Sequence, residues 1–143
     1  MWPPKVILHP TDFSDCSHHA FRLACQLAHE CHAKLIVVHA HHPMMTAVGD
    51  VPPMVVEVEN ETESNRRLQM IQALNLNIKI ERLMKTGGAV DVILDAAKHY
   101  HVDLVVIGTH GRKGMNRLLL GSVAENVLRR SPCPVLTTRP PWD

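Results

Sequence analysis

Three glycines and a serine in the last third of the chain have a spacing that suits phosphate binding. They are Gly108, Gly111, Gly121 and Ser122, in the pattern Gly-x2-Gly-x9-Gly-Ser. Glycine admits positive φ angles and lets a ligand approach the backbone closely. The first N–H groups of a helix lack partners within the helix and favour negative charge. A glycine-punctuated loop that leads into a helix is therefore a candidate cradle for phosphate.

The same residues also have a purely structural interpretation. Gly108 can end a strand and Gly121 can precede a helix. Ser122, with Glu125 three residues later, matches a capping box, in which the two side chains satisfy the free N–H groups of the helix start. The two interpretations are compatible, because the backbone N–H of Ser122 stays available even if its hydroxyl caps the helix.

The glycine loop requires a strand before it and a helix after it. Leu104 to Ile107 is an unbroken apolar run rich in β-branched residues, which is typical of a strand buried on both faces. After Ser122, apolar residues recur at helical spacing. These positions are Val123, Ala124, Val127 and Leu128. The sequence thus predicts that the loop connects the end of a central strand to the start of a helix.

The first strand brings a second candidate loop into the argument. Val6 to Leu8 form a short apolar strand that we expect to end at His9-Pro10, because proline cannot continue a central ladder. Pro10, Thr11 and Asp12 would then form the loop at its carboxyl end. Apolar residues at helical spacing from Cys16 to Cys31 predict the helix that follows.

The remaining elements follow from the same patterns. They are a second buried strand at Leu35–Val38 with Ala40 at its end, a mobile loop from His41 to Pro53, a helix within Val56–Leu74, an edge strand at Asn77–Met84, a helix from Val90 to about Tyr100, and a final strand at Val135–Thr138. Strands that alternate with helices of ten or more residues indicate parallel βαβ units.

These elements predict the fold class. Three strands with continuous apolar runs belong in the middle of the sheet, and the two weaker strands belong at its edges. We therefore expect one α/β domain over residues 1–143, with an open five-stranded parallel sheet in the order 3-2-1-4-5 and helices on both faces. Ligands bind such sheets where the winding reverses, here between strands one and four. The two candidate loops would meet at that point.

Longer stretches around these loops resemble a known family. The stretches I-L-H-P-T-D-F-S (7–14), G-T-H-G (108–111), G-S-V-A-E-N-V-L (121–128) and S-P-C-P-V-L (131–136) are similar to the universal stress protein family. The similarity extends from Lys5 to about Arg139, and the glycine spacing is that of the nucleotide-binding branch. The resemblance implies the same strand order, a bound ATP or AMP, a role in stress survival, and a homodimer formed through the last strand. A Mg²⁺ ion would be held mainly by the nucleotide.

Carried over by position, the resemblance also implies roles for individual residues. Asp12 and the backbone of Ala40 would hold adenine, and Pro10 and Gly108 would approach the ribose. Thr11, in the same loop as Pro10 and Asp12, is also a candidate binding residue. The phosphates would be held by Gly111, Gly121, Ser122 and Val123. Without the glycine motif, Asp12 is better suited to cap the first helix, whereas the two motifs together favour its role in ligand binding. Cations in the nine-residue spacer, which are Arg112, Lys113 and Arg117, are candidates to pair with phosphate oxygens.

Two functions compete for this crevice. The first is an adenine-nucleotide-binding regulatory module, and the second is a slow ATPase or nucleotide hydrolase. The lysine that precedes the serine in a P-loop is missing before Ser122, and the sequence offers no evident general base. We therefore favour the module and assign no catalytic residue. A phospho-receiver domain is excluded, because Asp12 is a lone acid after strand one and strand three ends near Lys85.

The composition of the chain limits the possible partners, metal sites and cellular location. Fifteen basic and fourteen acidic residues give a net charge of +1, so we expect neither nucleic acid nor a membrane surface as a partner. The four cysteines form no C-x-x-C pair and the eleven histidines form no familiar zinc pattern, so we expect no metal site in the protein. The start of the chain lacks the apolar region of a signal peptide, which predicts a reduced, cytoplasmic protein.

Overall fold

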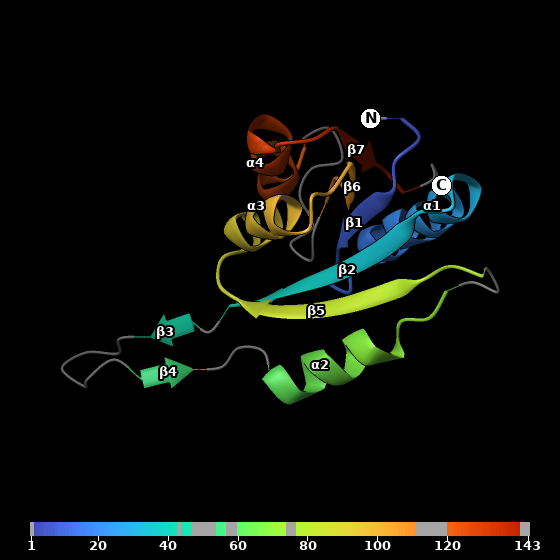
Figure 1. Cartoon of the computed structure of the whole chain (residues 1–143). Coiled ribbons are helices and arrows are strands. Elements are labelled where there is room, and N and C mark those ends of the chain that lie inside the picture. The colour runs from blue at the N-terminus through green and yellow to red at the C-terminus, as the bar shows by residue number, and fades with distance from the viewer. Residues whose placement is uncertain are drawn as a thin grey trace.

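A five-stranded parallel sheet forms the centre of the structure (Figure 1). The computed structural model describes residues 2–42, 44–46, 54–56, 60–73, 77–110 and 120–140. The strands of the sheet are β1 (Val6–Pro10), β2 (Lys34–His41), β5 (Ile80–Thr86), β6 (Leu104–Gly108) and β7 (Val135–Thr138). They lie in the order β5-β2-β1-β6-β7, with every neighbouring pair parallel. Numbered among themselves, these strands confirm the predicted order 3-2-1-4-5.

Helices cover both faces of this sheet. The helices are α1 (Asp15–Cys31), α2 (Glu61–Met70), α3 (Ala89–His99) and α4 (Ser122–Arg130). Helices α1 and α2 pack on one face, over the side chains of Ile7 and Val37. Helices α3 and α4 pack on the other face, over Leu8 and Val38. Neighbouring residues of the central strands are thus buried on opposite faces, which explains their unbroken apolar runs.

Strand β1 continues through Pro10, two residues beyond the predicted apolar run. Pro10 aligns with Val38 of β2, and the next residue, Thr11, donates its N–H to the Val38 carbonyl at 2.8 Å. On the other side, pairing with β6 extends only from Ile7 to Leu8. Pro10 has no N–H to donate, and its nitrogen is on the β6 side of the strand, where no pairing is described at this position. The proline therefore ends β1 without the loss of a ladder hydrogen bond.

Three other boundaries differ from the sequence prediction. Strand β3 (Met44–Thr46), which lies in the predicted mobile loop, pairs antiparallel with β4 (Met54–Val56), which follows that loop, in a separate two-stranded sheet. Helix α2 begins only at Glu61, where the Asn60 side chain accepts from the N–H groups of Thr62 and Glu63. Strand β5 covers residues 80–86, three residues later at its start than predicted, because its pairing with β2 begins at Ile80. No helix in the described ranges has the length and apolar character needed to cross a bilayer.

Candidate functional site

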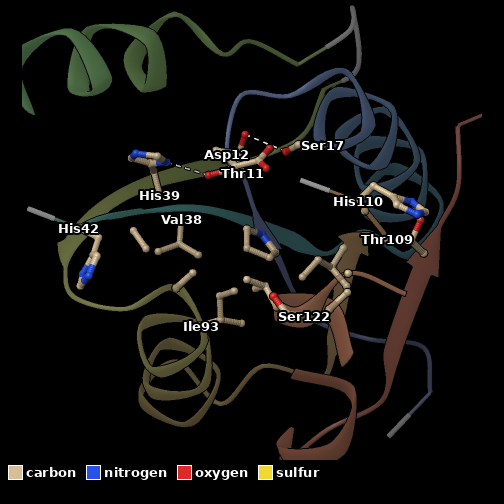
Figure 2. A pocket seen from close by; sticks show the side chains of 18 residues that line it. Thr11, Asp12, Ser17, Val38, His39, His42, Ile93, Thr109, His110 and Ser122 are labelled. Carbon is tan, nitrogen blue, oxygen red and sulfur yellow. Dashed lines mark hydrogen bonds between the residues drawn. The ribbon is translucent and has the colours of Figure 1, made fainter. Parts of the chain in front are cut away.

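A cavity of about 510 Å³ opens at the carboxyl ends of β1, β2 and β6 (Figure 2). It lies on the face of the sheet that α3 and α4 cover, since its walls include Val38, Ile93 and Ala124 of that core cluster. Eight of the nine residues predicted for the site line this cavity: Pro10, Thr11, Asp12, Ala40, Gly108, Gly121, Ser122 and Val123. The ninth, Gly111, lies outside the described residues. The structure therefore brings the two candidate loops together at the switch point of the sheet.

Thr11 fixes the loop that follows β1. Its hydroxyl oxygen accepts from the Ser17 hydroxyl at 2.9 Å and from the Phe13 N–H at 3.1 Å. Its carbonyl accepts from Nδ1 of His39 at 2.8 Å (Figure 2). With its N–H bonded to β2, Thr11 is held at three atoms and is almost fully buried. The backbone between Pro10 and Asp12 is therefore held in one position relative to β2 and α1.

Asp12 is not the cap of α1. The N-cap is Ser14, whose side chain accepts from the N–H of Ser17 at 3.1 Å. One carboxylate oxygen of Asp12 accepts from the Ser14 N–H at 2.9 Å, and the half-buried side chain lines the cavity. Asp12 is also the one carboxylate among the described lining residues. Ser14, and not Asp12, is thus the N-cap of α1, and the Asp12 carboxylate faces the cavity.

Gly108 and Gly121, which line the cavity, each allow a close approach to the backbone of another segment. A Cβ atom at Gly108 would lie 2.9 Å from Sγ and 3.1 Å from the carbonyl oxygen of Cys16, at the start of α1. A Cβ atom at Gly121 would lie 2.5 Å from the Thr109 carbonyl oxygen, which accepts the Gly121 N–H at 2.6 Å. The contacts of 2.9 Å and 2.5 Å are closer than real Cβ atoms show, so neighbouring atoms would have to shift. Side chains at these two positions would push apart the elements that frame the cavity.

Helix α4 starts at the cavity without a side-chain cap. Its N-cap is Gly121, in an extended conformation, and this residue makes no side-chain cap hydrogen bond. The alternative of a capping box of Ser122 and Glu125 does not apply, because Gly121 and not Ser122 is the N-cap, and Glu125 pairs with Arg129 at 2.9 Å. The first intrahelical bond joins the Glu125 N–H to the Gly121 carbonyl. The N–H groups of residues 122–124 thus have no acceptor within the helix, at the wall of the cavity.

Several lining residues were not predicted from the sequence. Figure 2 shows His42 and His110 at opposite ends of the cavity, with Val38 and Ile93 between them. Ile93 belongs to α3, and only the packing of that helix brings it to the switch point. The position of His39 and His42 on either side of Ala40 was a usable signal, because they flank the predicted end of strand two.

The charges around the cavity complete its description. The described lining residues include three histidines and Asp12 but no lysine or arginine. Arg112, Lys113 and Arg117, the predicted cations of the spacer, lie outside the described residues. Within the described part of the chain, no group of three or more histidine, cysteine, aspartate or glutamate side chains is placed to hold a metal ion.

Comparisons with known proteins give a consistent result. The model of the universal stress protein family matches residues 4–139. The universal stress protein MJ0531 of Methanocaldococcus jannaschii is 32% identical over 149 residues, which cover 96% of this chain and 83% of that protein. The solved structure of universal stress protein UspA from Lactobacillus plantarum has a TM-score of 0.75 at 24% identity, covering 94% of this chain and 97% of that one. A universal stress protein crystallised in complex with cAMP has a TM-score of 0.71 at 29% identity, covering 95% and 97%.

Proposed function

The chain belongs to the universal stress protein family, and from this premise we propose that it is a stress-response regulatory module that binds ATP or AMP. The nucleotide would occupy the cavity at the carboxyl ends of β1 and β6. A family member at 29% identity was crystallised with cAMP, which is an adenine nucleotide. A cytoplasmic location agrees with four free cysteines.

One observation carries this proposal: a single cavity combines an apolar wall, a carboxylate and an uncapped helix start. The apolar wall includes Val38, Ile93 and Ile107, and it suits the faces of a planar base. The Asp12 carboxylate can accept from an exocyclic amino group of that base. The N–H groups at the start of α4, which have no acceptor within the helix, suit phosphate. Asp12 is the one described carboxylate of the lining, so a Mg²⁺ ion would be held mainly by the phosphates.

The replacement Ser122→Glu tests where the phosphates bind. Ser122 is exposed at the first position of α4, where a carboxylate is favourable for the helix but repels a bound phosphate. We expect the affinity for ATP to fall by about tenfold or more, while the affinity for adenosine changes by less than about twofold. Isothermal titration calorimetry with both ligands measures the two effects.

The control variant for this test is Gln26→Glu, which adds the same charge at an exposed position of α1 away from the cavity. It should leave both affinities unchanged. An equal loss for ATP and adenosine, or no loss in Ser122→Glu, would contradict the proposed orientation of the nucleotide. Mass spectrometry of the ligand released from the purified protein would decide between ATP and AMP.

The competing function, a slow ATPase, makes a different kinetic prediction. Backbone N–H groups stabilise bound phosphates in the substrate and the transition state alike, so they do not by themselves accelerate hydrolysis. We expect single-turnover hydrolysis of ATP well below about 1 s⁻¹, the lower end of typical enzyme rates. Excess protein mixed with radiolabelled ATP and Mg²⁺ would give the rate of phosphate release. A faster rate that Asp12→Ala or Ser122→Ala abolishes without loss of ATP binding would establish an ATPase.

We also propose that the protein forms a homodimer through β7. This strand ends the sheet, since β6 is its one partner among the described strands, and Leu136 on it is 38% exposed. An open edge strand is a template for pairing with another copy. Light scattering should give about twice the chain mass of 16.0 kDa, and Leu136→Glu should return the mass to that of one chain. A wild-type mass of one chain at micromolar concentration would contradict the dimer.

A further inference from the structure

A second cavity of about 510 Å³ lies between α1 and α2, on the sheet face opposite to the first. Its walls come from the loop after β1, the first two turns of α1 and the end of α2. Thr11 lines both cavities, so the two are separated by a single loop. No part of the proposed nucleotide site uses the side chains of this second cavity other than Thr11.

The second cavity has an apolar base and a cationic rim. Phe21, with 4% of its surface exposed, lies at the base, and the half-buried Phe13 and Ile71 extend the apolar wall. The exposed side chains of the lining include His18 and Arg67. No aspartate or glutamate is among the described lining residues. This distribution suits a molecule with an apolar body and a negative charge at one end.

The guanidinium of Arg67 is held in place above the apolar wall. It lies 4.7 Å from the centre of the Phe13 ring, which in turn lies 4.5 Å from the ring of the buried His39. Phe13 has a φ angle of 63°, a left-handed conformation that a phenylalanine rarely adopts. That conformation presents the ring to Arg67, so the cation is positioned before any ligand arrives.

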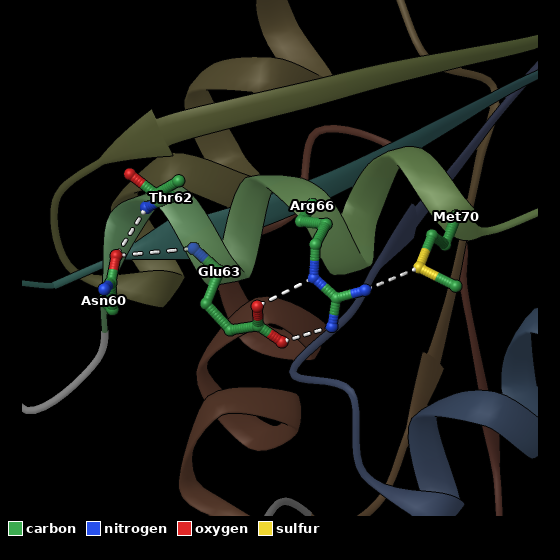
Figure 3. A network of polar contacts seen from close by, with 5 residues as sticks. All are labelled: Asn60, Thr62, Glu63, Arg66 and Met70. Carbon is green, nitrogen blue, oxygen red and sulfur yellow. Dashed lines mark hydrogen bonds and ion pairs between the residues drawn. The ribbon is translucent and has the colours of Figure 1, made fainter.

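Arg66, the neighbouring cation, is already engaged. Its guanidinium donates to both carboxylate oxygens of Glu63, at 2.7 and 2.8 Å, and to the sulfur of Met70 at 3.1 Å (Figure 3). The hydrogen bond from Arg66 lowers the pKa of the Glu63 carboxyl, which therefore stays ionised and balances the Arg66 charge. Among the described lining residues, Arg67 is the cationic side chain that this pair does not neutralise.

The wall formed by α2 is anchored to the sheet. Arg82 of β5 donates from Nε at 3.0 Å, and also from Nη2, to the carbonyl of Ile71 at the end of α2. Leu68, one turn earlier, is fully buried against the sheet. The helix is thus fixed on the sheet at its last turn, which is the turn that lines the cavity. The cavity is formed by anchored elements, and a ligand need not create it.

We propose that this second cavity binds a small organic anion, with its apolar body against Phe21 and Phe13 and its charged group at Arg67. Apolar contact with the two rings supplies the affinity, and the guanidinium supplies the preference for an anion. This proposal does not rest on the proposed nucleotide site, so an experiment can contradict either proposal and leave the other standing.

The probe for this site is 2-naphthoate, with the neutral 2-naphthamide as its matched control. Titration calorimetry of the full chain should show binding of 2-naphthoate, and binding of 2-naphthamide should be at least about fivefold weaker. Arg67→Gln should lower the affinity for 2-naphthoate by about fivefold and leave that for 2-naphthamide unchanged. Arg22→Gln, at an exposed position of α1 that does not line the cavity, should bind both as the wild type does.

Competition with ATP separates this site from the first cavity. Excess ATP should not displace 2-naphthoate, and Arg67→Gln should bind ATP with wild-type affinity. The proposal is overturned if 2-naphthoate does not bind, if ATP displaces it, or if Arg67→Gln and Arg22→Gln bind it equally well. Arg67 is exposed, so its replacement should leave the fold intact, which circular dichroism can verify.

Discussion

The variant Gly121→Ala is expected to lose about 3 kcal/mol of its free energy of unfolding and at least about tenfold of its affinity for ATP. The added Cβ atom would lie 2.5 Å from the Thr109 carbonyl oxygen. That oxygen belongs to the backbone and accepts the Gly121 N–H, so it cannot move away as a flexible side chain would. The start of α4 must shift instead, and the free N–H groups of its first turn shift with it. Urea denaturation and ATP titration measure the two losses.

Gly88→Ala is a closely matched control for this prediction. Gly88 is the N-cap of α3 and Gly121 is the N-cap of α4, and both have extended backbone angles and no side-chain cap. A Cβ atom at Gly88 would meet nothing nearer than the Asp91 carboxylate at 4.0 Å. Gly88→Ala should lower the free energy of unfolding by less than about 1 kcal/mol and leave the affinity for ATP unchanged. Equal losses in the two variants would show that the helix cap, and not the contact with Thr109, explains the effect.

The free energy of unfolding is expected to fall by about 3 kcal/mol between pH 6.5 and 4 because of His9 alone. Complete burial lowers the pKa of His9 from 6.5 to about 4, although the bond to the Val106 carbonyl and the nearby Asp12 oppose this shift. Between these two pH values the unfolded chain binds a proton at this site and the folded chain does not. The contribution of His9 to the free energy of unfolding is therefore fully present above pH 6.5 and is lost as the pH falls towards 4.

The difference between the wild type and His9→Leu isolates this contribution. Urea denaturation at pH 7 and pH 5 should show the wild type losing about 2 kcal/mol more than His9→Leu over that interval. Ile7→Val is the control, because it weakens the same buried face of β1 without removing a titrating group. Its pH dependence should equal that of the wild type. A wild type and a His9→Leu variant with the same pH dependence would disprove the assignment.

The sequence by itself determined which strands lie at the centre of the sheet. Strands buried on both faces need continuous apolar runs, and the runs at Leu35–Val38 and Leu104–Ile107 lie on either side of β1. The weaker segments form β5 and β7 at the edges. Because parallel strands with crossover helices leave few possible orders, this information was enough for the topology. It was also enough to place the loops after β1 and β6 at one crevice.

Local sequence patterns predicted the structure less reliably where the same residues were compatible with two different local structures. The Ser122–Glu125 spacing predicts a capping box, but Glu125 pairs with Arg129 and the helix begins uncapped. Helix α2 was placed too broadly, because the alternating sequence before it has no helical period and only the Asn60 cap marks its start. In each case the local pattern was compatible with more than one structure, and the start of the helix became clear only from its cap residue in the fold.

Only the tertiary structure decided the features that depend on segments far apart in the chain. The contact between Gly121 and the Thr109 carbonyl, the burial of His9, and the approach of Arg67 to Phe13 each join separate elements. Sequence periodicity shows which face of an element is buried but not which atoms it meets there. The second cavity is of this kind: its residues lie on the loop after β1 and on two helices that pack on the same face of the sheet, and no spacing in the sequence predicts the gap between them.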